Sequence, residues 1–225
     1  MAKSKFYWAF CLILLMTGCS QEDKNSLQTR FYENGAAKPI VAIVPLIDNS
    51  RHKLNWNVSD EITALVHYRL MQKDKLYLVD EEKVGHMIKK IKADTSLFDT
   101  DLSWVKKIFF EDEFVVFMEL IHHEQTPITQ KELTAPEDLA SELNLSVRIR
   151  VIDIREEPSK VVLQEIIKGA HFVPAQFNAS HFLQVEWGKE NYSISPIGMA
   201  HAQISKELAA RLEDYILLSM SKKYE

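Results

Sequence analysis

The residues best suited to metal chemistry are eight histidines, because imidazole is a common metal ligand and titrates near neutral pH. None of them belongs to an HExxH motif, and no two are four residues apart, the spacing that places two ligands on one helix face. If a strand includes the adjacent pair His122 and His123, the two side chains point to opposite faces. The sequence therefore predicts no metal site. The other histidines are His52, His67, His86, His171, His181 and His201.

Catalysis by a nucleophile or a buried acid has little support in the sequence. There is no GxSxG motif and no glycine-rich phosphate loop. Glu119 is the unusual residue of an apolar run, where burial would raise the pKa of its carboxyl and suit it to catalysis. Alternatively, Glu119 pairs with Arg148 or Arg150 across a sheet or lies at a solvated rim, and this structural interpretation is favoured. We therefore expect a protein that is not an enzyme, without catalytic residues or cofactors.

Both cysteines lie in an N-terminal segment unlike the rest of the chain. Residues 1–5 carry two lysines and no acid, and residues 6–16 form an unbroken run of eleven apolar residues. This run is too short to cross a bilayer of about 30 Å as a helix. A positive start followed by a short apolar run is typical of a secretory signal peptide, here expected over residues 1–18.

The end of that signal, Met16 to Cys19, resembles the bacterial lipobox. The resemblance implies cleavage between Gly18 and Cys19, a diacylglyceryl group on the thiol of Cys19, and an N-acyl chain such as palmitate on its amino group. Met16 departs from the commoner leucine. The alternative is an ordinary secretory signal with an incidental cysteine. Ser20 is not the aspartate that resembles an inner-membrane retention signal, so an outer-membrane protein facing the periplasm is expected.

The composition of the 225 residues is that of one globular domain with a short polar lead. The net charge of −5 gives no reason to expect a nucleic-acid partner. Residues 19–38 are polar and predict a lipidated cysteine followed by a flexible tether, which would reach about 65 Å when extended. Residues 39–225 are expected to form the folded domain.

Hydrophobic periodicity in residues 39–225 predicts a single α/β domain with helices packed on a mixed β-sheet. Apolar runs rich in β-branched residues predict strands, and the alternation at 143–151 followed by a turn predicts a hairpin. Capping residues Ser59 and Asp80 predict two helix starts. The strands are expected near 40–47, 76–79, 114–121, 143–151 and 161–167, and the helices from 59, from 80, and over about 101–110 and 198–220.

Several segments together resemble known lipoprotein domains. VAIVPLIDNS, a helix, LYLVDEEKV, an apolar strand, RVIDI and a second strand resemble the periplasmic domains of the curli-secretion lipoprotein, the lipoprotein activators of penicillin-binding proteins and the Tol translocation protein. The resemblance implies an anticodon-binding-like α/β fold used for protein contacts. Two departures are a charged loop at 123–141 in place of membrane hairpins, and a tether shorter than that of the activators.

The segments AHFVPAQFN and WGKENYSISPIGMAHAQ more closely resemble a family of proposed outer-membrane lipoproteins of chlamydiae, which has no established activity. Within this stretch HFVPAQF is echoed by HFLQVEW, and the alternating residues predict a second hairpin. The aromatic residues either complete the core at the sheet edge or form an exposed surface that binds a partner protein. These residues are Phe172, Phe177, Phe182, Trp187 and Tyr192.

The sequence thus predicts a non-enzymatic outer-membrane lipoprotein that acts through protein–protein contacts in envelope assembly or maintenance. Two alternatives stay open. One is a periplasmic accessory component of a secretion complex. The other is a lipoprotein that binds a small ligand in a pocket with polar groups around Glu119, Asp153 or His122.

Overall fold

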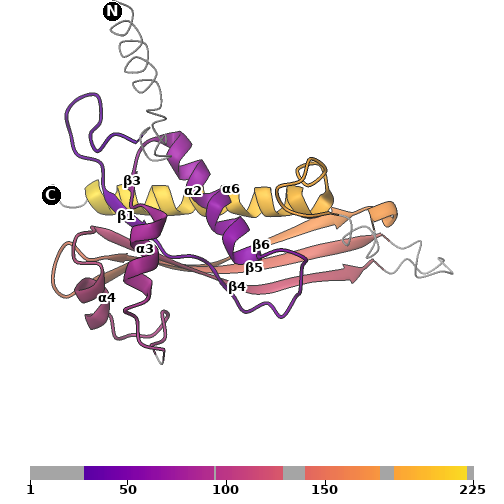
Figure 1. Ribbon diagram of the computed structural model, residues 1–225, viewed down its shortest axis with the longest axis horizontal. Coiled ribbons are helices and arrows are strands. Elements are labelled where there is room, and N and C mark those ends of the chain that lie inside the picture. Colours follow the sequence, from indigo (N-terminus) through magenta and orange to yellow (C-terminus); the bar gives the residue numbers. More distant parts are fainter. Residues whose placement is uncertain (1–27, 94, 129–139, 178–184, 222–225) are drawn as a thin grey trace, which may run out of the picture.

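Alternating apolar side chains build a β-sheet with helices on both faces, seen in the computed structural model (Figure 1). The structure describes residues 28–93, 95–128, 140–177 and 185–221. The single-domain α/β fold predicted from the sequence is confirmed. Its elements are β1 (Ile40–Ile43), β2 (Ile47–Asp48), α2 (Val58–Lys73), β3 (Tyr77–Leu78), α3 (Glu81–Ile88), α4 (Ser103–Ile108), β4 (Phe114–Pro127), β5 (Ser141–Asp153), β6 (Lys160–Val173), η2 (Ala175–Phe177) and α6 (Pro196–Ser221).

The sheet is mixed, as predicted, with strand order β3-β1-β4-β5-β6. β1 runs parallel to both β3 and β4, and the short β2 also pairs in parallel with β4. β4, β5 and β6 form an antiparallel meander and are the longest strands. The predicted hairpin is present, and its two strands extend beyond the predicted limits.

Side chains of β4 separate the interior into two apolar clusters. Phe114, Val116 and Met118 pack in the cluster under α2 and α6. Val115 and Phe117 point to the opposite face and pack in the smaller cluster under α3 and α4. Because successive side chains of a strand alternate between faces, a run that is apolar throughout requires both faces of the sheet to be covered.

Side-chain caps define where the helices begin. Asn57, not the predicted Ser59, caps α2, and its side chain accepts hydrogen bonds from the backbone N–H groups of Ser59 and Asp60. Asp80 caps α3 in the same way, as predicted. Beyond the last turn of α2, Asp74 adopts a left-handed backbone conformation (φ 51°) that ends the helix.

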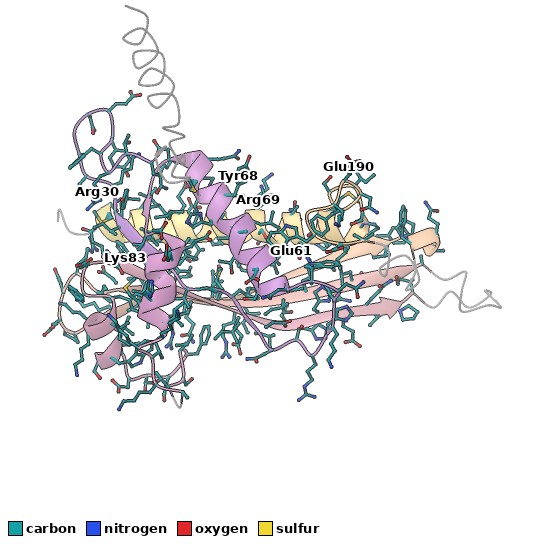
Figure 2. The ribbon with its side chains drawn as sticks, in the orientation of Figure 1. Arg30, Glu61, Tyr68, Arg69, Lys83 and Glu190 are labelled. Atoms are coloured by element: carbon teal, nitrogen blue, oxygen red, sulfur yellow. The ribbon has the colours of Figure 1, made fainter. Side chains whose placement is uncertain are left out.

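The described part of the predicted tether packs against the domain. The side-chain oxygen of Gln28 accepts a hydrogen bond from the backbone N–H of Leu78 at 3.2 Å, and the Tyr32 hydroxyl donates to the Lys75 carbonyl at 2.6 Å. Lys38 is buried, with Nζ 2.6 Å from Asp74 Oδ1. Residues 28–38, predicted as part of a free tether, are therefore held against the domain, at the opposite end of the molecule from the end of β6 (Figures 1 and 2). The polar composition of residues 28–38 did not predict this packing, because their contacts with the domain are hydrogen bonds and an ion pair.

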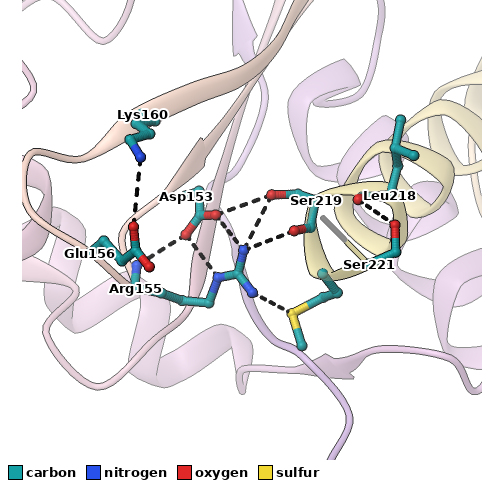
Figure 3. A network of polar contacts seen from close by, with 8 residues as sticks. Asp153, Arg155, Glu156, Lys160, Leu218, Ser219 and Ser221 are labelled. Carbon is teal, nitrogen blue, oxygen red and sulfur yellow. Dashed lines mark hydrogen bonds and ion pairs between the residues drawn. The ribbon is translucent and has the colours of Figure 1, made fainter. Parts of the chain in front are cut away.

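A polar network joins the end of β5 to the end of α6 (Figure 3). Arg155 Nη2 lies 2.5 Å from Asp153 Oδ2 and donates to the Ser219 carbonyl at 3.2 Å, while the Ser219 hydroxyl donates to Asp153 at 3.1 Å. Burial alone would raise the pKa of Asp153, but the hydrogen bonds from Arg155 and Ser219 hold it below its ordinary value. Asp153 thus holds α6 on the sheet and does not line a pocket with free polar groups.

Candidate functional site: a buried glutamate–histidine cluster

Ionisable side chains from three elements meet inside the cluster under α2 and α6. Glu61 projects from the first turns of α2 (Figure 2), His201 comes from the start of α6, and His123 comes from β4. Glu61 and His201 are completely buried, and His123 is nearly so. Buried polar groups are costly unless they are hydrogen-bonded, so the contacts within this Glu61–His201–His123 cluster decide its role.

The cluster is a continuous chain of short polar contacts. Trp56 Nε1 donates to Glu61 Oε2 at 2.5 Å, and His201 Nδ1 lies 2.7 Å from Glu61 Oε1. His201 Nε2 in turn lies 2.9 Å from His123 Nε2. Since a carboxylate only accepts hydrogen bonds, Nδ1 of His201 carries a hydrogen and donates a hydrogen bond to Glu61. Both oxygens of the buried carboxylate are thereby satisfied.

A β-bulge places His123 in the cluster. The pairing of β4 with β5 shifts between Leu120 and His122. Without the shift, His122 would follow Leu120 onto the face under α6. With it, His123 is buried there and His122 is exposed. The prediction that the two histidines point to opposite faces is consistent with this burial.

The first turn of α6 positions His201. Ser195 Oγ accepts a hydrogen bond from the backbone N–H of Gly198 at 3.1 Å and so caps this turn. A Cβ at Gly198 would lie only 2.0 Å from the Tyr192 carbonyl oxygen. A glycine is therefore required three residues before His201, because any side chain would push the helix away from the segment that precedes it.

Further histidines extend the cluster toward the surface. The His52 ring stacks on His123 with centroids 4.4 Å apart and planes inclined at 22°. Burial, helped by the neighbouring His201 and His52 rings, lowers the pKa of His123 to about 3. Burial also lowers the pKa values of His52 and His171. These three imidazoles are therefore neutral at neutral pH.

Acidification is expected to destabilise the fold through His123. Its pKa is lower in the folded chain than in the unfolded chain, so the unfolded state binds the proton more readily below about pH 6.5. The free energy of unfolding should fall by about 2–3 kcal/mol between pH 7.5 and pH 4.5 through this group alone. Urea unfolding of the wild type and of His123→Gln at both pH values measures it: the variant should lose less stability on acidification. An equal loss in both proteins would exclude His123 as the cause.

Asp112 is a second buried ionisable group and lies outside the cluster. It is buried, and neither carboxylate oxygen has a hydrogen-bond partner among the described residues. Burial raises the pKa of Asp112 to about 6, partly offset by Lys83. The charged form therefore destabilises the fold at neutral pH.

Asp112→Asn should consequently increase the free energy of unfolding at pH 7.5 by about 1–2 kcal/mol. This advantage should shrink as the pH falls from 6 toward 4, because the wild-type carboxyl then becomes protonated in the folded state. Thermal and urea unfolding across this pH range would measure it, with the exposed Glu82→Gln as the control. A stability gain that does not depend on pH would contradict the explanation.

The contacts of the cluster join separate segments of the fold. Within the described ranges, the only hydroxyl recorded near either histidine nitrogen is that of Tyr192, 3.4 Å from His201 Nδ1. In the same part of the chain, no group of three or more His, Cys, Asp or Glu residues could hold a metal ion. The cluster ties α2, α6, β4 and the loop before α2 together.

The other predicted polar candidates are engaged in pairs. Glu119 faces Arg148 directly across the sheet, Arg148 Nε donates to it at 2.7 Å, and Asn49 Nδ2 donates at 2.6 Å. The favoured interpretation of Glu119 as a cross-strand partner is thus confirmed, with Arg148 and not Arg150. His122 is exposed, 3.3 Å from Glu124. Two surface clefts lie away from these residues: one of about 420 Å³ between α3 and residues 108–111, and one of about 680 Å³ beside α4.

The predicted aromatic surface does not form one exposed face. Tyr192 is buried and meets the Trp56 ring edge to face, with centroids 5.9 Å apart, while Phe177 and Trp187 pack half-buried against the core. Phe172 is 63% exposed, and Phe182 lies outside the described residues. The first arm of the predicted second hairpin is not a strand beyond Val173, because η2 follows, and its turn and most of its second arm lie outside the described residues. Tyr192 completes the core because its ring covers the Glu61–His201–His123 cluster.

Glu61, His201 and Trp56 were missed as a group by sequence reasoning. Glu61 looked like an ordinary acidic residue in the first turn of a helix, and His201 lies 140 residues away from it in the chain. The one signal that could have identified Glu61 and His201 is their position on otherwise apolar helix faces.

In the part of the chain that the structure describes, no helix is long and apolar enough to cross a membrane.

Comparison with known proteins gives a family. Residues 27–220 match the model of DUF7499, a family of unknown function. The chain belongs to this family. The match of this DUF7499 chain takes in all of the described residues of the fold except Ser221. No match was found among curated proteins.

Several solved structures are similar to this chain to different degrees. The hypothetical protein CT253 from Chlamydia trachomatis is 24% identical, with a TM-score of 0.61 over 80% of this chain and 98% of that one. Lipoprotein GNA1162 from Neisseria meningitidis is 14% identical (TM-score 0.42; 65% of this chain and 90% of that one). The LpoB C-terminal domain from Salmonella enterica is 12% identical (TM-score 0.37; 59% and 81%). The predicted resemblance to a chlamydial protein is confirmed for the fold; the other two matches are too distant to support a further conclusion.

Proposed function

We propose that this protein is a non-enzymatic lipoprotein of the bacterial outer membrane, whose domain faces the periplasm and binds another envelope protein. The observation that carries the anchor is the position of Cys19, directly after Thr17 and Gly18 at the end of an eleven-residue apolar run. That arrangement resembles a lipoprotein signal, and two or three acyl chains are sufficient for stable anchoring. The matches to proteins named as lipoproteins agree with this proposal without extending it.

The binding surface proposed is the outer part of the β4–β5–β6 meander. On the face opposite α6, the apolar cluster under α3 and α4 reaches along β5 only to Ile152 and Ile154. Further along the sheet, Arg148 pairs with Ile166 and Glu142 pairs with Phe172 in register, and both apolar side chains are exposed. Two exposed apolar side chains on the same face of a long strand offer apolar area to a protein partner.

β6 also offers a free edge. It is the last strand in the sheet order, it is fourteen residues long, and no other described strand pairs with its outer side. Unpaired backbone groups on such an edge can accept a strand from another protein. The partner we propose is therefore an extended protein segment that adds to β6 and places apolar side chains on Ile166 and Phe172.

Photo-crosslinking in intact cells tests the proposal. A photoreactive amino acid at Phe172 should yield one dominant crosslinked protein, whereas the same amino acid at Phe110, which is 68% exposed at the other end of the meander, should not. Loss of the product on replacing Ile166 by aspartate would support contact with this surface. Failure to crosslink from Phe172, or the same product from Phe110, would overturn the proposed surface.

A further inference from the structure

The end of the domain at which the anchor must attach is defined by the structure. Gln28, the first described residue, is held by its side chain to the backbone of β3, and the next ten residues pack beside the end of α2. We call residues 28–38 and 72–77 the anchor-side end. It lies away from the far end of β6, where the proposed partner surface is located (Figure 1).

The chain between Cys19 and Gln28 is short. Nine residue steps reach at most about 30 Å when fully extended, and about 15–18 Å as a flexible coil. The docking of residues 28–38 thus shortens by about half the reach of 65 Å expected for a free tether up to residue 38. Gln28 therefore stays within about 30 Å of the acylated Cys19, close to the membrane surface.

We propose that the anchor-side end contacts the phospholipid surface in which Cys19 is embedded, so that the β4–β6 end points away from the membrane. This inference rests on the lipid anchor proposed above. The proposed partner of the anchor-side end is the layer of phospholipid headgroups. The first supporting observation is the short chain between Cys19 and Gln28, which joins the domain at this end.

The charge of the anchor-side end provides the second observation. Residues 28–38 and 72–77 contain four cations and two anions, and two further anions pair with these cations, Glu113 with Arg30 at 4.0 Å and Glu213 with the two lysines of 72–77. The charges at this end therefore balance, whereas the whole chain has a net charge of −5. Lys73 Nζ and Lys75 Nζ lie 3.3 and 3.1 Å from the buried carboxylate of Glu213. The two lysines share this single negative charge, so the three side chains together carry one net positive charge. Cationic side chains near a membrane surface are attracted by anionic headgroups.

Aromatic residues are the third observation. Phe31 is 56% exposed on the segment that leads from Gln28, and the Tyr68 ring is exposed on α2 (Figure 2). Aromatic rings favour the headgroup region because they combine apolar area with tolerance of a polar environment. Lysines and aromatic rings beside the exit of a lipid anchor thus form a surface suited to a bilayer interface.

Single-cysteine fluorescence labelling can test the orientation. Cys11 would be removed with the signal and Cys19 would be blocked by lipid, so a cysteine introduced at residue 31 or 172 would be the only free thiol. Phe31→Cys and Phe172→Cys are matched, because both replace an exposed phenylalanine. Mature protein purified from cells would carry an environment-sensitive dye and be reconstituted in vesicles of phosphatidylethanolamine and phosphatidylglycerol containing headgroup-quencher lipids.

Quenching should be several-fold stronger at residue 31 than at residue 172, and the difference should diminish in vesicles of phosphatidylcholine alone. Equal quenching, or stronger quenching at 172, would overturn the orientation. The unsubstituted protein serves as a separate control: if it reacts with the thiol dye, Cys19 is free and the lipid anchor itself is excluded, together with the orientation. If the unsubstituted protein does not react with the dye, the lipid anchor is retained and the quenching result tests only the orientation of the domain.

Discussion

Replacing Glu61 by alanine is expected to lower the free energy of unfolding by about 3–5 kcal/mol. The carboxylate accepts one hydrogen bond from Trp56 and one from His201. The side chains of Glu61 and His201 are both inaccessible to solvent. Removing the carboxylate takes away the partner of the buried imidazole N–H and of the indole N–H of the half-buried Trp56, and adds a cavity between α2 and α6. Each unsatisfied buried donor costs about 1–3 kcal/mol, which accounts for most of the expected loss.

Urea unfolding followed by circular dichroism would measure this loss. Glu82→Gln is the matched control, because Glu82 is exposed and 3.7 Å from His86 in a surface pair, which contributes little. A double-mutant cycle of Glu61→Gln and His201→Gln isolates the pair, and we expect a coupling energy above about 1 kcal/mol. A Glu61→Ala variant as stable as the Glu82→Gln control would show that the Glu61–His201–His123 cluster does not hold the helices together.

Cys19→Ala should abolish membrane association. Each buried methylene contributes about 0.8 kcal/mol to insertion, so loss of all acyl chains removes the whole anchoring energy. Fractionation should find the variant in the soluble periplasmic extract and the wild type with outer membranes. Any variant chain that keeps its uncleaved signal peptide is counted separately, because it retains the apolar residues 6–16. Incorporation of a palmitate analogue should also be lost.

Cys11→Ala is the control for that experiment, because the expected cleavage before Cys19 discards residue 11. It should label and fractionate like the wild type. Palmitate label retained by Cys19→Ala would contradict the lipid anchor, and with it the proposal of an anchored envelope protein. Recovery of the wild type with inner membranes would keep the anchor but contradict the outer-membrane location.

Much of the fold was predictable because its elements are locally encoded. The uninterrupted apolar run of β4 requires a covered sheet, and the alternation of Leu143, Leu145 and Val147 in β5 requires one apolar and one polar face. Both patterns follow from side-chain alternation along a single strand. The capping role of Asp80 was equally local, since a cap bonds N–H groups two and three residues ahead.

Contacts between distant elements were less accessible to sequence reasoning. That Glu119 pairs with a positive residue of β5 could be anticipated, but the choice of Arg148 over Arg150 required the register of the two strands. The docking of residues 28–38 depends on hydrogen bonds with the end of α2 and with β3, and these have no hydrophobic periodicity to reveal them. The salt bridge of the buried Lys38 with the exposed Asp74 shows the same difficulty.

The sequence by itself determined the predicted anchor and the class of fold, because a signal peptide and an alternating strand are patterns of neighbouring residues. Only the tertiary structure decided the Glu61–His201–His123 cluster. Its members lie 78 and 140 residues apart, and His123 faces them only because a bulge shifts β4 by one residue after Leu120. A one-residue shift exchanges the two faces of a strand, and it depends on pairing with β5, which no local pattern in β4 encodes.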